Sequence, residues 1–122
     1  MEQEKMYPEA IAEFEEAVRL SGRPIEAVAN LGHAYAVSGR REEAMRLIEE
    51  LKGWSERGYD PLANIALVHA GLGQNDEAMR WLEKAYEDRS PQMVFLKMEP
   101  RVDSLRADPR FKDLLRRVGL PL

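Results

Sequence analysis

The sequence predicts an all-α protein, a right-handed array of helical hairpins stacked one after another. Two observations support this prediction. The chain repeats itself every 34 residues, so that the pair Glu-Ala recurs at residues 9–10, 43–44 and 77–78. Within each repeat, apolar residues recur at three- and four-residue steps, the spacing of an amphipathic helix. Units of this length bury their apolar faces only against their neighbours, so they must stack to be stable.

The first three helices are predicted from apolar periodicity and from glycine stops. The first is expected at about 8–20, because the fixed φ of Pro8 suits a first helical turn. The second is expected at about 24–38, ending at a Ser-Gly pair. The third contains the apolar residues between 44 and 51 and is predicted to end near Gly53.

The next two helices are predicted from capping residues. Asp60 precedes Pro61, so its carboxylate is expected to cap a helix at about 60–72. Asn75 is expected to cap a helix at about 75–88, since a side-chain oxygen at that position can accept from free backbone N–H groups.

The C-terminal part carries the same signature of a capping residue followed by proline. Ser90-Pro91 predicts the start of a short helix, and Asp108-Pro109 predicts a last helix that runs to about Val118. Residues 100–106 are expected to form a further short turn of helix, with Val102 and Leu105 facing inward. The last helix is apolar on one face and polar on the other, as the end of an array requires.

Composition favours one soluble domain. The chain has 122 residues, enough for one continuous core and too few for two. It has no cysteine, which excludes disulfides, thiolate metal sites and thiol nucleophiles. No apolar run approaches the roughly 20 residues that cross a membrane, and the acidic start does not resemble a secretory signal. We therefore expect a cytoplasmic protein that does not bind membranes.

The two central repeats share a pattern of small and apolar residues. The middle repeat contains Leu31-Gly32, Tyr35, Gly39, Ala44 and Ile48. The following repeat contains Leu62, Ile65-Ala66, Gly73, Ala78, Leu82 and Ala85. Both repeats are similar to the tetratricopeptide repeat (TPR), a helix-turn-helix unit with small residues where its helices cross. In the second of them, Ala66 replaces the usual glycine and His69 the usual tyrosine, so His69 is expected in the core. The segment from Phe95 to Pro121 resembles the endings of bacterial multidomain proteins whose last module is such an array.

The resemblance implies one TPR-like domain over residues 1–122, with about two and a half units. We expect a half repeat at 8–24, repeats at 25–58 and 59–92, and a C-terminal cap at 93–122. It also implies a non-catalytic scaffold that captures a peptide or helix of a partner protein in a concave groove lined by the first helix of each unit. By alignment, the groove residues are Glu26, Asn30, His33, Val37, Asp60, Asn64 and Leu67.

The predicted groove has a distinct chemistry. Asn30 and Asn64 occupy the same row of the repeat, and an asparagine amide can both donate to and accept from a partner backbone. The groove positions hold no lysine or arginine, whereas Glu26 and Asp60 are acidic. We therefore expect a neutral or basic partner, and we expect no clamp for a C-terminal carboxylate.

The N-terminal end suggests an alternative function. The half repeat lacks its first helix, so Ile11, Phe14 and Val18 are expected to form an uncovered apolar face. Such faces tend to associate, which would make the chain a self-assembly module and a homo-oligomer. A further alternative is the regulatory tail of a larger enzyme or transcription regulator.

No pattern of residues indicates catalysis, a cofactor or a metal. His33 and His69 are the only histidines, and they fall in different rows of the repeat. Ser/His/Asp arrangements and phosphate-binding glycine loops are absent from the sequence. The basic residues between 97 and 117 alternate with acids, which favours a solvated helix face over a nucleic-acid footprint. Trp54 and Trp81 are expected to pack between repeats.

Overall fold

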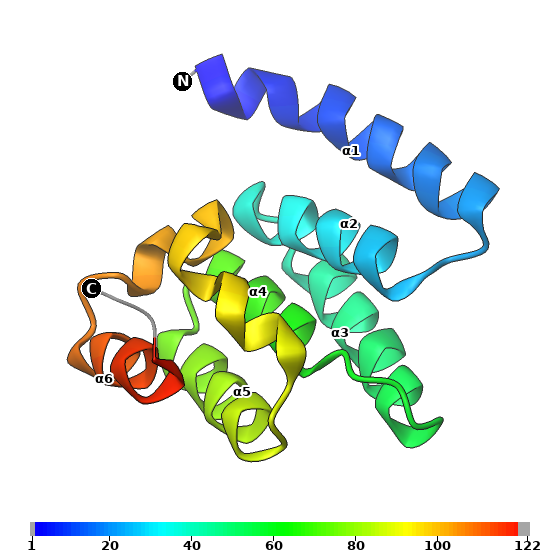
Figure 1. The fold of residues 1–122 in the computed structure, drawn as a ribbon. Coiled ribbons are helices and arrows are strands. Elements are labelled where there is room, and N and C mark those ends of the chain that lie inside the picture. Colours follow the sequence, from blue (N-terminus) through cyan, green and yellow to red (C-terminus); the bar gives the residue numbers. More distant parts are fainter. Residues whose placement is uncertain (1, 120–122) are drawn as a thin grey trace.

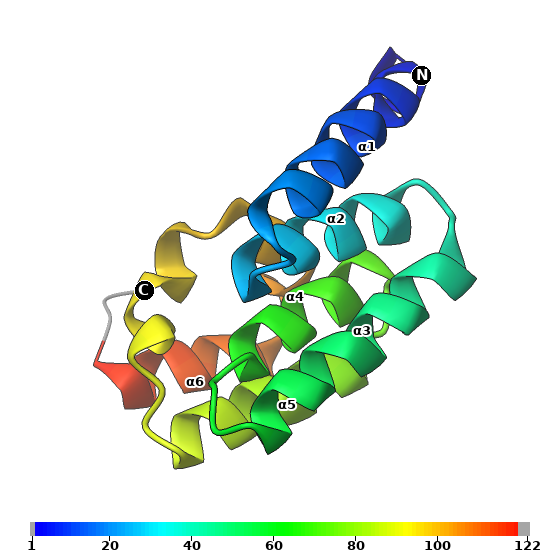
Figure 2. The same cartoon turned by 90° about the vertical axis from the view of Figure 1, so that its right-hand side faces the viewer.

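The protein is an array of helices joined by short connections (Figure 1), seen from the side in Figure 2. The computed structural model describes residues 2–119, without the side chains of residues 2–7, 94, 95 and 97. The elements in chain order are α1 (Glu2–Ser21), α2 (Ile25–Val37), α3 (Arg41–Glu56), α4 (Leu62–Gly71), α5 (Asn75–Glu87), the 3₁₀ segments η1 (Pro91–Met98) and η2 (Pro100–Leu105), and α6 (Pro109–Val118). The predicted all-α repeat architecture is confirmed.

The 34-residue period is visible in where the helices begin. The second helices of the two central hairpins, α3 and α5, begin at Arg41 and Asn75, which are 34 residues apart. A further 34 residues along the chain, α6 begins at Pro109. The period therefore continues into the C-terminal part, where η1 and η2 take the place of a first helix and α6 that of a second.

Proline explains why this last unit has no α-helix in its first half. Pro100 disfavours the α conformation of the residue before it, and Glu99 is extended, with φ −84° and ψ 109°. The chain consequently breaks into two 3₁₀ segments at this point. Val102 and Leu105 of η2 are both 0% exposed, as the sequence predicts.

The core consists of apolar rows that repeat along the array. The residues of α3 and α5 that face their own first helices are 0% exposed; these are Ala44, Ile48, Leu51, Ala78, Leu82 and Ala85. Buried side chains form two clusters, one around α2 and α3 and one around α4, α5 and α6. Trp81 packs against both clusters, which confirms its predicted place between units.

Two predicted helix boundaries are wrong. The first helix begins at Glu2, so that Pro8 lies inside α1 and does not open it. The third helix continues through Gly53 to Glu56. Gly53 has no positive φ and stays helical, whereas Gly58, with φ +91°, lies just beyond the end of α3. Glycine ends a helix through its left-handed conformation, and only the latter adopts it.

Two predicted caps are also wrong. The N-cap of α4 is Pro61, and the side chain of Asp60 does not cap the helix. Asn75 is already the first residue of α5, behind Gln74. Asp108 is the predicted cap that the structure confirms, since its carboxylate accepts a hydrogen bond of 2.9 Å from the Arg110 backbone N–H.

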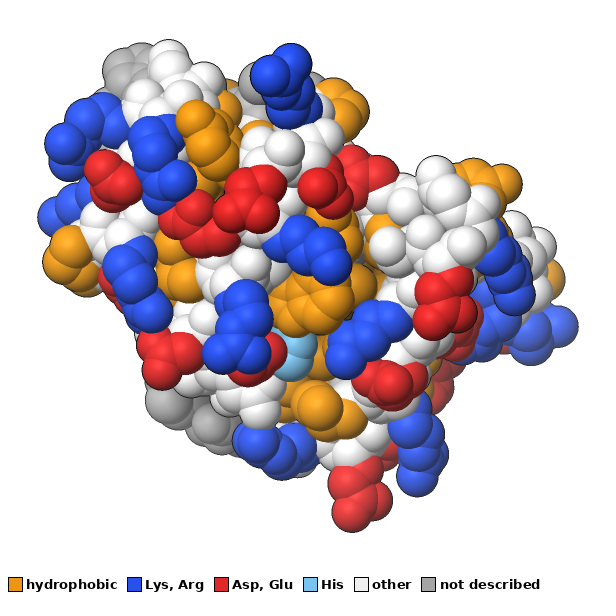
Figure 3. Space-filling model, turned by 90° about the horizontal axis from the view of Figure 1, so that it is seen from below, with side chains coloured by type: hydrophobic (Ala, Val, Ile, Leu, Met, Phe, Trp, Pro, Cys, Tyr) orange, Lys and Arg blue, Asp and Glu red, His pale blue; other side chains and the backbone are white. Residues whose placement is uncertain are grey.

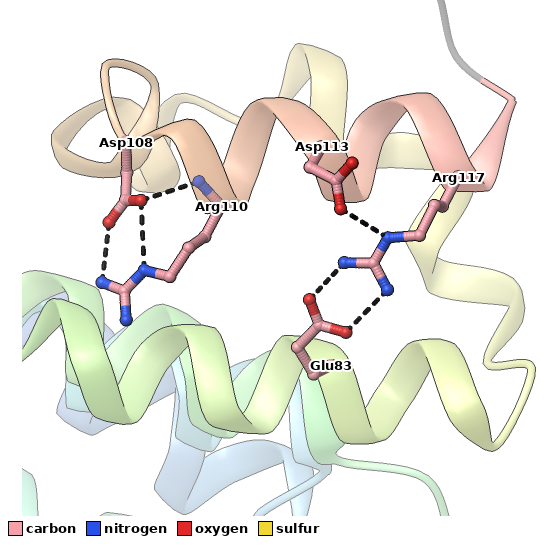
Figure 4. Close-up of polar contacts among 5 residues, drawn as sticks. All are labelled: Glu83, Asp108, Arg110, Asp113 and Arg117. Atoms are coloured by element: carbon pink, nitrogen blue, oxygen red, sulfur yellow. Dashed lines mark hydrogen bonds and ion pairs between the residues drawn. The ribbon is translucent and has the colours of Figure 1, made fainter.

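The helix α6 closes the C-terminal end of the array. Its apolar face buries Phe111, Leu114 and Leu115. Its polar face is held to α5 by Arg117, which donates to Glu83 at 2.9 Å and pairs with Asp113 at 2.9 Å (Figure 4). Since these ionic groups are about a third exposed or more, we assign most of the stability of this contact to the apolar face.

The surface beneath α5 carries mixed charge. Seen from that side, basic and acidic side chains alternate, with hydrophobic side chains in small patches between them (Figure 3).

Candidate functional site

The predicted groove residues lie at different depths on α2 and α4. On α2, Asn30 and His33 are half-buried, whereas Glu26 and Val37 are exposed. On α4, Asn64 and Leu67 are only 2% and 5% exposed. Asp60 precedes α4 and is half-buried. The single row predicted from the alignment is thus partly a surface and partly a buried layer.

The chain covers part of this groove itself. The segment η2 packs against α4 near α2, where the orange part of the chain lies in Figure 1. Arg101, at the start of this segment, donates a 2.6 Å hydrogen bond from Nη1 to Asn30 Oδ1 and pairs with Glu99. The prediction of a groove without basic side chains is therefore wrong. The sequence contains no local signal for Arg101, because it lies 71 positions after its partner Asn30.

His33 is half-buried in this covered region. The pKa of His33 is lowered to about 4, mainly by burial and also by the positive charge of Arg101, against the opposing effect of Glu99. The His33 ring also packs closely on α4, since a Cβ placed on Gly71 would lie 2.9 Å from His33 Cδ2. His33 is consequently a neutral packing residue at pH 7.

An open pocket remains beside the covered part. It has a volume of about 490 Å³ and lies between the start of α2, the start of α4 and the C-terminal segment. Its lining residues are Glu26, Ala63, Asn64, Leu67, Gln92, Leu96, Met98, Glu99 and Arg101. The structure thus brings together three of the predicted groove residues, whereas Asn30, His33, Val37 and Asp60 do not line the pocket.

The Asn64 amide is only half satisfied. Its Nδ2 donates to Glu26 Oε1 over 3.3 Å. Its Oδ1 is buried, and no group in the described part of the chain donates to it. A buried acceptor without a donor costs about 1–3 kcal/mol, so this amide is a site where an incoming donor would be stabilised.

The α1 helix exposes a different face from the one predicted. Ile11 and Val18 are 2% and 1% exposed, because they pack in the core that α1 shares with α2. Their assignment to an uncovered face is wrong. Of the three predicted residues, Phe14 is half-buried.

The row of α1 that is incompletely covered contains Ala10, Phe14, which packs in part against the core around α2 and α3, and Ala17. The equivalent residues in α3 and α5 are 0% exposed, but Ala10 and Phe14 are only half-buried and Ala17 is exposed. Among the described residues, no other helix lies on the side of α1 that faces away from α2, and the N-terminal end of α1 projects beyond the body of the array (Figure 2).

The two histidines have different surroundings. His69 is 5% exposed, as expected of a core residue, and its Nδ1 lies 2.7 Å from Gln74 Oε1. Among the described residues, no three His, Asp or Glu side chains are grouped so that they could hold a metal ion. Within the same residues, no helix combines the length and apolarity that crossing a membrane requires.

Comparisons with known proteins identify the repeat. Two family profiles, both described as tetratricopeptide repeat, match residues 2–57 and residues 62–89. Comparisons with curated proteins and with solved structures found no significant match. The matched segments contain the hairpins α2–α3 and α4–α5 and the lone helix α1. The chain therefore belongs to the tetratricopeptide repeat family.

Proposed function

We propose that this chain captures a peptide or helix of a partner protein in the groove formed by α2, α4 and the C-terminal segment. Tetratricopeptide repeats are generally protein–protein interaction modules and are typically non-catalytic. The observation that carries the proposal is the pocket of about 490 Å³ that contains the half-satisfied Asn64 amide. Its size suits a few side chains of an extended segment and falls within the range of binding pockets.

The lining of the pocket favours a partner that is neutral or basic. Ala63, Leu67 and Leu96 supply apolar walls, and the pocket holds two carboxylates, Glu26 and Glu99, against one guanidinium. An acidic partner would therefore meet net negative charge, which disfavours binding.

A peptide array tests the proposal. The full chain is applied to a library of acetylated, amidated octapeptides, and the dissociation constants of the bound sequences are measured in solution. Met98 is 84% exposed and lines the pocket, so we expect Met98→Ala to weaken binding about tenfold through lost apolar contact. Met45 is 36% exposed and lies on α3, away from the pocket, which makes Met45→Ala the matched control.

Two results would contradict the proposal. One is an array with no bound peptide, and the other is an equal loss of affinity in the Met98→Ala and Met45→Ala variants.

We propose self-association through α1 as a second candidate function. The observation that favours it is the row Ala10, Phe14 and Ala17, whose equivalents elsewhere in the array are fully covered by a helix. A second copy of the chain can present the same apolar row, so two α1 helices would bury it against each other. This proposal replaces the predicted face, since Ile11 and Val18 are already buried.

Two alanines on α1 provide a matched test. Ala17 is exposed within the incompletely covered row, whereas Ala12 is exposed in a row that holds Arg46 and Arg80 in the other repeats. We expect sedimentation equilibrium to show a dimer of the wild-type chain at high concentration. Ala17→Glu should weaken dimerisation at least tenfold, because the substitution places a charge in the interface. Ala12→Glu should leave the dimerisation constant unchanged. A monomeric mass up to millimolar concentration would refute this candidate.

A further inference from the structure

We infer that the pocket beside Asn64 binds a cationic side chain of the partner, arginine or lysine. This inference rests on the proposed function, because it specifies the chemistry of the same groove. It derives from comparing two equivalent positions of the repeat, one of which already holds such a side chain.

The occupied position is Asn30. Its Oδ1 accepts a 2.6 Å hydrogen bond from the guanidinium of Arg101, which reaches it from the C-terminal segment. Arg101 is at the same time paired with Glu99. At Asn30, the asparagine side chain therefore binds an arginine that is also paired with a carboxylate.

The equivalent position in the next unit is Asn64, which lies one 34-residue repeat after Asn30. Its side chain carries the same acceptor, and a carboxylate again stands beside it, because Nδ2 donates to Glu26. The Oδ1 has no donor within the described residues. The second asparagine thus has the acceptor and the carboxylate of the first without the cation.

The pocket also suits the rest of a basic side chain. Ala63, Leu67 and Leu96 line it and can pack against the aliphatic stem, as apolar surfaces do along arginine and lysine. The Glu26 carboxylate can pair with the charged end, and the bond that it accepts from Asn64 is long, at 3.3 Å. Glu26 is exposed, so its side chain can turn toward an entering cation and release the Asn64 amide group that it now binds through Nδ2.

The experiment uses four sets of octapeptides with random flanks and one fixed central residue. The central residue is arginine, its neutral isostere citrulline, lysine, or the neutral norleucine. We expect the full chain to bind the arginine set at least tenfold more tightly than the citrulline set, and the lysine set more tightly than the norleucine set.

A pair of variants locates the preference. Glu26→Gln removes the pocket carboxylate beside Asn64 and leaves Glu99 paired with Arg101, and we expect it to reduce the ratio of arginine to citrulline affinity to below threefold. Glu42 is exposed in the first turn of α3, so Glu42→Gln makes the same change of net charge elsewhere and should keep the ratio. An equal fall in both variants would mean that net charge alone attracts the peptide, which overturns the inference.

The outcomes separate this inference from the proposed function. If peptides bind with equal affinity whether the centre is arginine or citrulline, the inference is overturned and groove binding still stands. If none of the four sets binds, both are overturned.

Discussion

The helices α2 and α4 pack against each other, and two glycines allow this packing to be tested. A Cβ placed on Gly71 would lie 2.9 Å from His33 Cδ2 and 3.0 Å from the Cβ of Ala36. The Ala36 Cβ is attached directly to the backbone of α2, so it cannot move away without the helix. A Cβ on Gly53, inside α3, would meet no atom within 4 Å.

These distances predict opposite effects of the same substitution. Forcing a methyl group into packed helices costs about 1–3 kcal/mol. Replacing a helical glycine by alanine contributes about 0.5–1 kcal/mol in return, and less at Gly71, which is the last residue of α4. We therefore expect Gly71→Ala to lower the free energy of unfolding by roughly 1–2 kcal/mol. We expect Gly53→Ala to raise it by about 0.5–1 kcal/mol.

Urea denaturation followed by far-UV circular dichroism measures both variants. With an m-value of about 1–3 kcal/mol per molar, the Gly71→Ala midpoint should fall by roughly 0.5–1 M at an unchanged slope. The Gly53→Ala midpoint should rise. A Gly71→Ala protein at least as stable as the wild type would refute the close approach of α2 and α4.

Three further predictions concern the groove and the C-terminal helix. The pKa of His33 is lowered from 6.5 to about 4, so protonation of this histidine favours the unfolded chain. The free energy of unfolding should therefore fall as the pH drops below 6.5, by about 2 kcal/mol between pH 7.5 and pH 5. Urea midpoints across this range should show the loss in the wild type, and the same loss in His33→Gln would contradict the assignment. Arg101→Gln removes a positive charge that lowers the pKa of His33, and an NMR titration should therefore give a higher His33 pKa in this variant. An unchanged pKa would show that Arg101 does not lie beside the His33 ring. Phe111 is 1% exposed in α6, so Phe111→Ala should lower the free energy of unfolding by about 3–5 kcal/mol. Lys112 is exposed, so Lys112→Ala should change that free energy by less than about 0.5 kcal/mol. Equal effects of the two variants in urea denaturation would refute the docking of α6.

The caps of α4 and α6 show that the same local sequence pattern can have different outcomes in the fold. Asp108 and Asp60 each precede a proline in the same local pattern, yet only Asp108 caps its helix. The Oδ1 of Asp60 is buried and finds no donor among the described residues. Local sequence offers the same cap at both positions, but in the fold α4 begins at Leu62 and the side chain of Asp60 does not bond to its free N–H groups.

The buried face of α1 is likewise not determined by local sequence. Ile11, Phe14 and Val18 are all apolar, and their spacing correctly indicates a helix. Which side of that helix is covered depends on the direction from which α2 approaches it, and this direction buries Ile11 and Val18. A helical period identifies an apolar stripe, but it does not say which part of the stripe a neighbour will cover.

The sequence by itself determined the repeat, the family and the order of the helices, because these follow from spacing within about 34 residues. Glycine and proline act on their own backbone, and apolar rows recur at helical steps, so both signals can be read without knowing the fold. Only the tertiary structure decided the composition of the candidate site. Arg101 reaches Asn30 across 71 positions of chain, and this contact exists because the breaks at Pro91 and Pro100 turn the last unit back over α4. A contact of this range is set by the packing of the whole array, for which no local pattern provides a signal.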